Sequence, residues 1–432
     1  MKKFNIGIAG LGTVGRGVYE ILQKQKDLLS LRTNCDFEVV AVASRSRKDF
    51  VSPSVRFYDN VLHLAQDPKI DIIVEVMGGY DLAKDLIHSA LKNNKKVVTA
   101  NKALLAEHGK EIQDWVDKYQ GVIGYEASVA GANPIIKAFR EGFVANEITE
   151  IYGILNGTCN FILTKMKNEK QDYKIALKEA QNLGFAEADP SFDVEGNDTA
   201  HKIVLLSSLA CSSLPNYKQT YLEGINKISI DDINLADELG YKIKLLGVFK
   251  KIGDQVQQSV YPALIKNSEK IAQVDGSYNA VLSKGNNFEY NLMIGRGAGG
   301  NPTGSAVVAD IIDVACQTKH NFLFNAESVN LQTTNIININ QRYGQYFVIF
   351  NFDKNNLSKT SVVEQIFANR INPVQCIFKE NNSFNSDDAK FLITGAILTE
   401  NHFENEIVEA ISLIDKSLAN NIKFIRVEQT NF

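Results

Sequence analysis

Cysteine is scarce in this chain, and its scarcity excludes two common ways of stabilising a fold. The 432 residues include five cysteines, which are widely separated and form no C-x-x-C pair: Cys35, Cys159, Cys211, Cys316 and Cys376. An odd, scattered set of thiols argues against a disulfide framework, and its spacing offers no zinc ligands. Thiols of this kind fit a reducing compartment, so we expect a cytoplasmic protein.

Long apolar runs and an excess of basic residues are also missing. No segment holds the roughly 18 uninterrupted apolar residues that would cross a bilayer. After Lys2 and Lys3 the chain runs into glycines instead of the apolar core of a signal peptide. The 46 Lys and Arg residues against 50 Asp and Glu give a net charge of −4. We therefore expect neither a membrane nor a nucleic-acid partner.

The composition that remains is typical of a globular protein built from more than one domain. Apolar residues make up 44% of the chain and charged residues 22%, close to the average of proteins that fold in water. A single hydrophobic core stops growing at about 250 to 300 residues. The length therefore predicts two or three domains.

A glycine-rich turn follows the first predicted strand. The apolar run 4–9 leads into the motif GLGTVG at 10–15, and apolar residues then recur at helical spacing. In such a turn the first glycine allows a sharp bend, the second lets a pyrophosphate approach the backbone, and the third lets the helix pack on the strand. The motif predicts a dinucleotide site that includes Gly10, Gly12, Thr13, Val14 and Gly15.

The end of the second predicted strand bears on the choice of cofactor. The run 38–43 is continuously apolar after its first residue, as in a parallel strand buried on both faces, and Ser44 and Arg45 follow it. An acidic residue here would accept a hydrogen bond from the ribose 2′-OH of NAD, whereas a guanidinium suits a 2′-phosphate. We expect NADP(H) to be preferred through Arg45, with NAD(H) as the alternative. Arg47 and Lys48 are interpreted as surface residues.

Two further buried strands are predicted at 70–77 and 96–100, with helical stretches between the strands. This alternation indicates an α/β fold with a doubly wound Rossmann domain over about residues 1–130. Ligands bind at the carboxyl ends of such strands, so Met77 and Gly78 are candidate cofactor contacts. Lys102 follows the last of these strands, although a lysine there is by itself more often solvated.

Four distinctive segments follow residue 131: GILNGTCN at 153–160, GFAEADP at 184–190, DVEGNDTAHK at 193–202 and GRGAGGNPT at 295–303. With the N-terminal motif, and in this order, they resemble the homoserine dehydrogenases of the monofunctional bacterial type. The resemblance implies the NAD(P)H-dependent, reversible reduction of L-aspartate 4-semialdehyde to L-homoserine. That reaction belongs to threonine, methionine and isoleucine biosynthesis.

The spacing of two charged residues agrees with this chemistry. Asp198 and Lys202 are four positions apart in a predicted helix, so that carboxylate and ammonium share one face. Reduction of an aldehyde needs a proton donor for the developing alkoxide. The resemblance assigns that role to Lys202 and places Lys102 beside substrate and cofactor. We expect the two ammonium groups to lower each other's pKa, with Asp198 partly offsetting the effect.

The resemblance also implies contacts for an amino-acid substrate. Glu187 is expected to bind the substrate ammonium, with Asp193 and Asp198 nearby, while Gly157 and Thr158 contact the other end of the substrate. The neighbouring acidic residue 189, which precedes a proline, is expected to cap the next helix instead.

A monovalent cation, Na⁺, is expected by the same resemblance. Its ligands would be the carboxylate of Glu126 and the backbone carbonyls of Val129, Gly131 and Asn133. Gly299 is expected to join the cofactor site from its own glycine-rich segment.

Two other interpretations remain open at this point. Cys159 could be the nucleophile of a different Rossmann aldehyde enzyme, but a thiolate needs an activating base, and the six histidines show no pairing in sequence. We favour a buried, unreactive thiol. The chain could also be a nucleotide and amino-acid sensor without catalysis, although Lys102, Asp198 and Lys202 argue against it.

The rest of the chain predicts two further modules. Residues 131–300 are expected to form an α+β domain for catalysis and oligomerisation, with about 300–320 returning to the Rossmann domain and a linker near 330–340. Residues 343–432 alternate in the order of a ferredoxin-like sandwich. The expected elements are strand 346–352, helix 361–369, strands 373–379 and 391–399, helix 404–418 and strand 422–427.

The C-terminal pattern resembles an ACT regulatory domain. Its turn at 353–360 lacks the Pro-Gly that such domains usually carry, so threonine feedback and a purely structural or dimerising role both stay open. A homodimer or homotetramer is expected.

Overall fold

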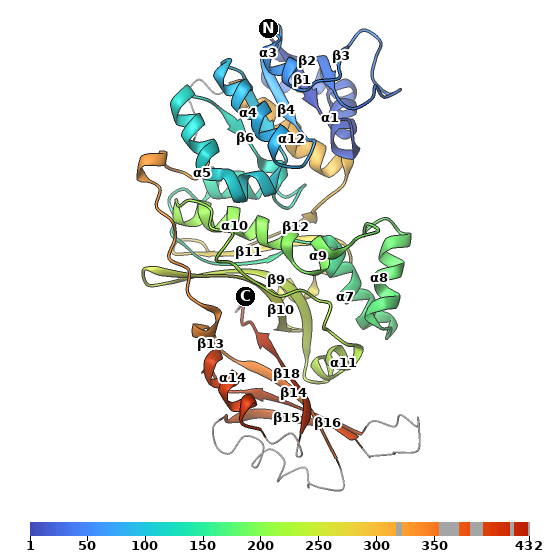
Figure 1. Cartoon of the computed structure of the whole chain (residues 1–432), viewed down its shortest axis with the longest axis vertical. Helices are drawn as coiled ribbons and strands as arrows, with labels where there is room; N and C mark the ends of the chain where they lie inside the picture. The colour runs from blue at the N-terminus through green and yellow to red at the C-terminus, as the bar shows by residue number, and fades with distance from the viewer. Residues whose placement is uncertain (317–321, 354–370, 381–391, 415–418, 431–432) are drawn as a thin grey trace.

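The computed structural model describes residues 1–316, 322–353, 371–380, 392–414 and 419–430. They form three parts stacked along the long axis of the molecule, with the N-terminal sheet at one end and the C-terminal strands at the other (Figure 1). Across these ranges, no helix combines the length and apolar character needed to cross a membrane.

The N-terminal part is built on a six-stranded parallel sheet with the order β3-β2-β1-β4-β5-β6. From β1 the chain adds strands toward one edge of the sheet, to β3, and then, from β4, toward the other edge. Open α/β sheets bind ligands where the strand order reverses in this way, here between β1 and β4. The four residues of β4 are all buried because helices cover both faces of the sheet. The doubly wound sheet is confirmed. Its strands are β1 Lys2–Ala9, β2 Cys35–Ala43, β3 Arg56–Tyr58, β4 Ile72–Glu75, β5 Lys96–Thr99 and β6 Ile123–Gly124.

One helix of this part comes from far along the chain. Helix α12 packs against α1, and a Cβ atom on Gly17 would lie 2.2 Å from the carbonyl oxygen of Gly300. Glycine is therefore needed for the two helices to approach this closely. Helices α1, α2 and α12 cover one face of the sheet and α3, α4 and α5 the other. Their bounds are α1 Thr13–Lys24, α2 Lys26–Thr33, α3 Leu62–Gln66, α4 Asp81–Lys92, α5 Lys102–Tyr119 and α12 Gly300–Cys316.

The middle part packs helices against the strands β12-β11-β7-β9-β10. Helix α10 lies between this sheet and α5, and is buried along most of its length (Figure 1). The strands are β7 Ile148–Ile154, β8 Tyr221–Leu222, β9 Tyr241–Ile252, β10 Gln255–Lys266, β11 Tyr278–Gly285 and β12 Glu289–Arg296. The helices are η1 Glu126–Ser128, α6 Ile135–Lys137, η2 Ala138–Gly142, α7 Gly157–Glu169, α8 Tyr173–Asn182, α9 Ser191–Val194, α10 Asn197–Cys211, α11 Ile230–Glu238 and η3 Lys270–Gln273.

The C-terminal part has the antiparallel strand order β18-β14-β16-β15, which is that of a ferredoxin-like sheet. Helix α14 ends at Ser412, short of the expected residue 418, and residues 415–418 lie outside the described residues. The helix expected at 361–369 lies outside the described residues. The elements are β13 Tyr343–Gly344, β14 Tyr346–Asp353, β15 Pro373–Glu380, β16 Leu392–Thr399, β17 His402–Phe403, α14 Glu404–Ser412 and β18 Asn420–Val427.

The segment expected as a linker is packed along the middle part. Thr333 and Ile336 each form a β-bridge to it, and two short helices, η4 Ser328–Asn330 and η5 Ile339–Gln341, flank these bridges. Strand β18 then pairs with β10 in parallel, so the sheets of the middle and C-terminal parts join into one.

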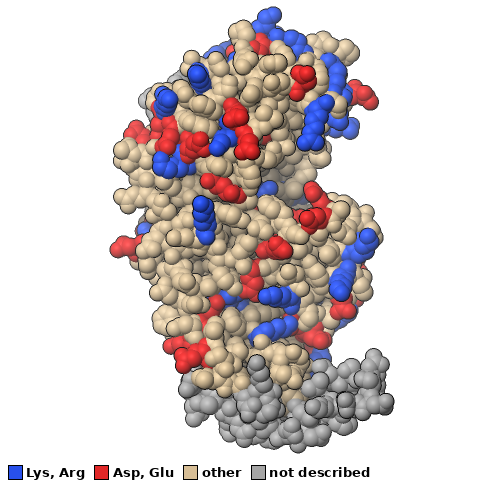
Figure 2. Space-filling model, viewed as in Figure 1, with Lys and Arg blue, Asp and Glu red and all other residues tan. Residues whose placement is uncertain are grey.

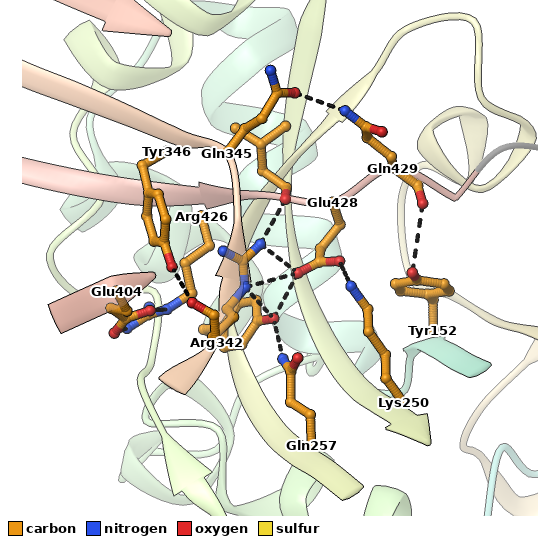
Figure 3. Close-up of polar contacts among 12 residues, drawn as sticks. Tyr152, Lys250, Gln257, Arg342, Gln345, Tyr346, Glu404, Arg426, Glu428 and Gln429 are labelled. Atoms are coloured by element: carbon orange, nitrogen blue, oxygen red, sulfur yellow. Dashed lines mark hydrogen bonds and ion pairs between the residues drawn. The ribbon is translucent and has the colours of Figure 1, made fainter. Parts of the chain in front are cut away.

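A buried charge cluster lies at this junction (Figure 3). The carboxylate of Glu428 accepts hydrogen bonds from Lys250 and Tyr261, each at 2.7 Å, and from Arg342 at 2.8 Å. The side chain of Glu428 is fully buried. Burial alone would raise the pKa of Glu428, but Lys250 and Arg342 outweigh it and lower that pKa to about 2.

Candidate active site

A cleft of about 680 Å³ opens between the N-terminal and middle parts. Figure 2 shows the surface hollowed between these two parts. Two glycine-rich loops and the first turns of α5, α7 and α10 contribute to its walls. The sequence-predicted residues that line it are Thr13, Val14, Lys102, Gly157, Thr158, Glu187, Asp193, Asp198, Lys202 and Gly299.

The glycine-rich turn before α1 has a packed side and an open side. Gly10 has φ +100°, and a Cβ atom there would lie 2.7 Å from the carbonyl oxygen of Val76. A Cβ atom on Gly15 would lie 2.0 Å from the carbonyl oxygen of Gly10, whereas one on Gly12 would meet nothing within 4 Å. The backbone at Gly12 is therefore open to an incoming ligand, as the dinucleotide motif requires.

The loop that follows β4 is held by a buried carboxylate. Glu75 accepts hydrogen bonds from the backbone N–H of Met77 at 2.9 Å and from the hydroxyl of Thr99 at 2.6 Å. Burial raises the pKa of Glu75. Met77 is half-buried. Gly78 is exposed, and its φ angle is +78°. We did not predict Glu75 from the sequence, although an acidic residue at the end of a buried apolar strand was a usable signal.

The basic residues after β2 differ in their contacts. Arg47 is exposed, as expected for a surface residue, and its guanidinium donates to the carbonyl oxygens of Ser52 at 2.7 Å and Val55 at 3.0 Å within its own loop. Arg45 is exposed and is not among the residues that line the cleft. The backbone N–H of Gly10 donates to the carbonyl oxygen of Ala43, the last residue of β2. Arg45, two residues later, therefore lies near the glycine-rich turn.

One carboxylate joins two lysines across the cleft. Asp198 contacts Lys202 at 2.7 Å through Oδ2 and Lys102 at 3.1 Å through Oδ1. Lys202 and Asp198 lie one turn apart on α10, which confirms the predicted helix, while Lys102 begins α5 of the N-terminal part. The ammonium of Lys202 also donates to the carbonyl oxygen of Leu155 at 2.6 Å. The pair of lysines therefore meets only where the two parts dock.

The pKa shifts of the two lysines have opposite directions. Burial lowers the pKa of Lys202, and the nearby Lys102 cation adds to this, while Asp198 opposes it. Asp198 instead raises the pKa of Lys102. Burial would raise the pKa of Asp198, but the two ammonium groups hold it below its usual range. The expectation that both lysines are lowered is thus wrong for Lys102, because its closest charge is the carboxylate.

An asparagine that we did not predict organises the acidic wall of the cleft. The Nδ2 group of Asn156 donates to Asp193 and to Asp198, each at 2.8 Å, and its Oδ1 caps α7 through the N–H of Cys159. Its place before a Gly-Thr pair was an N-cap signal in the sequence. The hydroxyl of Thr158 donates to the carbonyl oxygen of Phe185 at 2.6 Å, which fixes that side of the cleft.

Two acidic side chains near the cleft have different surroundings. Glu187 is exposed and lines the cleft, where a cationic ligand can reach it. Asp189 accepts hydrogen bonds from both the backbone N–H and the hydroxyl of Ser191 at the start of α9. The expected capping role of Asp189 is confirmed.

Cys159 is fully buried. Its thiol donates to the carbonyl oxygen of Asp193 at 3.2 Å, and burial raises the pKa of this thiol well above its usual value. A thiol in this state is a poor nucleophile. The preferred interpretation of Cys159 as a buried core residue is confirmed.

The residues expected to hold a cation lie behind the cleft. The carboxylate of Glu126 accepts from the backbone N–H groups of Ile136 at 2.9 Å and Lys137 at 2.8 Å, and burial raises its pKa to about 7. Val129, Gly131 and Asn133 follow and are buried. The described residues contain no cluster of three His, Cys, Asp or Glu side chains suited to a metal, so a cation here would depend on backbone carbonyls.

Comparison with known proteins gives a consistent assignment. Residues 134–312 match the homoserine dehydrogenase family model, and residues 10–125 match the model of the homoserine dehydrogenase NAD binding domain. The homoserine dehydrogenase of Neisseria gonorrhoeae is 46% identical over 317 residues, which are 73% of each chain.

Solved structures extend the likeness to the whole chain. A homoserine dehydrogenase from Thiobacillus denitrificans has a TM-score of 0.90 and 35% identity, over 100% of this chain and 99% of that one. A hyperthermophilic archaeal homoserine dehydrogenase in complex with NADPH has a TM-score of 0.63 and 27% identity, over 74% of this chain and 100% of that one. The identity to these enzymes and the extent of the matches show that this chain belongs to the homoserine dehydrogenase family.

Proposed function

We propose that Lys202 is the proton donor and acceptor in this homoserine dehydrogenase, which interconverts L-aspartate 4-semialdehyde and L-homoserine. The single observation that supports the assignment is the Asp198 carboxylate, which lies 2.7 Å from Lys202 and 3.1 Å from Lys102 in the cleft. A bound nicotinamide cofactor supplies the hydride to the carbonyl carbon, or removes it in the reverse direction. Lys202 gives its proton to the carbonyl oxygen as that oxygen gains negative charge.

The opposite pKa shifts suit a division of labour between the lysines. A lowered pKa makes Lys202 a stronger proton donor than an ordinary lysine, whereas a raised pKa keeps Lys102 cationic. A fixed cation beside the developing alkoxide stabilises it. Asp198 orients both groups, and we assign it to the catalytic set for that reason.

The substrate is proposed to bind along the acidic wall. Glu187 is the exposed carboxylate of that wall and would pair with the substrate ammonium. Asp193 and Asp198 add negative charge, and Gly157 and Thr158 form the adjoining surface at the start of α7. An amino acid that carries an aldehyde fits this arrangement of acidic and cationic groups.

The cofactor is proposed to be NADP(H) by preference, with the glycine-rich turn, Met77, Gly78 and Gly299 around it. Arg45→Ala should raise KM for NADP by about tenfold or more, because a charged hydrogen bond to the 2′-phosphate is lost, while KM for NAD stays close to its original value. Initial rates of homoserine oxidation with each cofactor measure this, with the exposed Lys48→Ala variant as control. An equal loss with both cofactors would contradict the role of Arg45.

A sodium ion is proposed at Glu126 and the carbonyls of Val129, Gly131 and Asn133. Because burial raises the pKa of Glu126 to about 7, its charged form costs stability as pH rises from about 4.5 through 7, and a bound cation would offset that cost. We expect NaCl to raise Tm more than tetramethylammonium chloride does at pH 8, and the difference to be smaller at pH 6, where Glu126 is largely protonated. Thermal unfolding of the wild type and of Glu126→Gln tests this, since a sodium effect that survives in the variant places the ion elsewhere.

Localisation and assembly are proposed from composition and resemblance. The scattered cysteines support a cytoplasmic enzyme, and the family resemblance supports a homodimer or homotetramer. The C-terminal part is proposed as an ACT-like regulatory domain, supported by its strand order. Most of the turn that would receive an effector, residues 354–360, lies outside the described residues.

A further inference from the structure

The two catalytic lysines belong to different parts of the chain, so their separation depends on how α5 and α10 are held together. Asp198 is one connection between these helices. A second connection lies one to two turns away and involves residues that the proposed reaction does not use. Its centre is the carboxylate of Glu107 on α5.

Glu107 accepts two hydrogen bonds, one from the loop after β4 and one from α10. The hydroxyl of Tyr80 donates to its Oε1 at 2.7 Å, and Nε2 of His201 lies 3.1 Å from the same oxygen. Tyr80 directly follows Gly79 in the loop after β4, and His201 directly precedes Lys202 on α10. Glu107 therefore joins the proposed cofactor loop, the helix of Lys102 and the helix of Lys202.

The histidine in this cluster has little freedom. His201 is 1% exposed, and its ring lies 4.5 Å from the ring of Tyr217 and 5.6 Å from that of Phe192. Phe192 also lies 5.9 Å from the ammonium of Lys102. Nδ1 of His201 is buried without a hydrogen-bond partner among the described residues. The Nε2–H donor to Glu107 is thus what orients the ring.

The shape of α5 couples Glu107 to Lys102. The helix is interrupted at His108, where φ is −118° and ψ is 16°. The residues from Lys102 to Glu107 form a short helical segment before this kink, capped by Asn101, whose side chain also bonds to Gly79. A shift of Glu107 would therefore move Lys102 with it.

We infer that Glu107 is a positioning residue, which sets the placement of Lys102 and Lys202 relative to the loop after β4 by holding Tyr80 and His201. The inference depends on the proposed roles of the lysines. It assigns no contact between Glu107 and the substrate or cofactor.

Removal of the carboxylate should slow turnover without weakening ligand binding. Glu107→Ala is expected to lower kcat about tenfold with KM for homoserine and NADP within about twofold, because misplacement of reacting groups affects the chemical step. Glu107→Gln keeps an oxygen acceptor and should recover kcat to within about threefold of the wild type. The matched control is Glu111→Ala, one turn later on α5, where an exposed carboxylate pairs with Lys84 and His108.

A second pair of variants tests the same connection from the other side. His201→Leu should lower kcat, but no more than Glu107→Ala, which also loses the contact to Tyr80, and His201→Gln, which retains an N–H donor, should recover part of the loss. The double variant of Glu107→Ala and His201→Leu should be no slower than Glu107→Ala alone, because the contact between Glu107 and His201 is already absent in that single variant. Tm of every variant shows whether the enzyme is folded.

Two results would overturn the inference: a Glu107→Ala enzyme as fast as Glu111→Ala, or a Glu107→Gln enzyme no faster than Glu107→Ala. Either leaves the proposed function standing if Lys202→Ala is inactive. Failure of the function itself would appear as an active Lys202→Ala enzyme, whatever the Glu107 variants do.

Discussion

Lys202→Ala should lower kcat by about 10²- to 10⁴-fold in both directions of the reaction, which is the usual contribution of a positioned general acid or base. The variant leaves the alkoxide without its proton donor. It also leaves Asp198 with Lys102 alone, so the local positive charge that stabilises the alkoxide is neutralised. Cofactor binding should persist, because the glycine-rich turn belongs to the N-terminal part.

The measurement is kcat from the absorbance of the reduced cofactor, with cofactor affinity measured by fluorescence titration. The control is a second buried lysine of the middle part. Lys244 is paired with Asp275 at 2.8 Å and does not line the cleft, so Lys244→Met should cost stability while each folded molecule keeps its turnover. Near-normal turnover of Lys202→Ala would refute the role of Lys202.

The Rossmann part was predictable because its signals are local. Each buried strand is a short apolar run, and the glycines at 10, 12 and 15 differ in what surrounds them, as the motif requires. The pairing of Asp198 with Lys202 follows from helical periodicity alone. Contacts between residues within a few positions of each other are thus predictable from the sequence.

Contacts that form only when distant parts of the chain pack together could not be predicted from the sequence. Lys102 reaches Asp198, which is 96 positions away, only because α5 packs on α10. The same contact raises the pKa of Lys102 when a lowered value was expected, since burial and distance decide the sign of the shift. The two hydrogen bonds of Asn156 could not be predicted for the same reason, because both carboxylates that it contacts lie more than thirty positions later in the chain.

The union of the middle and C-terminal sheets was not predicted for a similar reason. Strands β10 and β18 pair over a short stretch, Ala263 with Arg426 and Leu264 with Val427. Nothing in the sequence of either strand indicates that the other is its partner. Arg342 and Glu428 appear in the sequence as ordinary charged residues. Only the fold shows that both are buried at the junction (Figure 3).

Glu428→Ala should lower the free energy of unfolding by about 3 to 5 kcal/mol, as is usual when one member of a buried ion pair is removed. Arg342 is 1% exposed and would lose its carboxylate, and its Nη1 is already without a hydrogen-bond partner among the described residues. Lys250 and Tyr261 would lose an acceptor as well. The cost is therefore larger than that of one surface contact.

The control is another ion pair between the same two parts of the molecule. Lys379 of β15 contacts Glu238 of α11 at 2.6 Å, with side chains 47% and 45% exposed. An exposed pair contributes about 0 to 1 kcal/mol, so Glu238→Ala should change stability little. Urea unfolding followed by far-UV circular dichroism compares the two variants, and equal losses would contradict a special role for the buried cluster.

The pH dependence of stability gives a further check on the same residue. The pKa of Glu428 is lowered to about 2 in the folded protein, so its contribution is present above the unfolded value of about 4.5 and is lost as pH falls toward 2. The difference in unfolding free energy between wild type and Glu428→Gln should therefore narrow with acidification over that range. A difference that stays constant would mean that Glu428 acts through shape and not through charge.

Because β18 and β10 share one sheet, the wild-type middle and C-terminal parts should unfold in one transition, and a separate early transition in Glu428→Ala would identify this cluster as their connection.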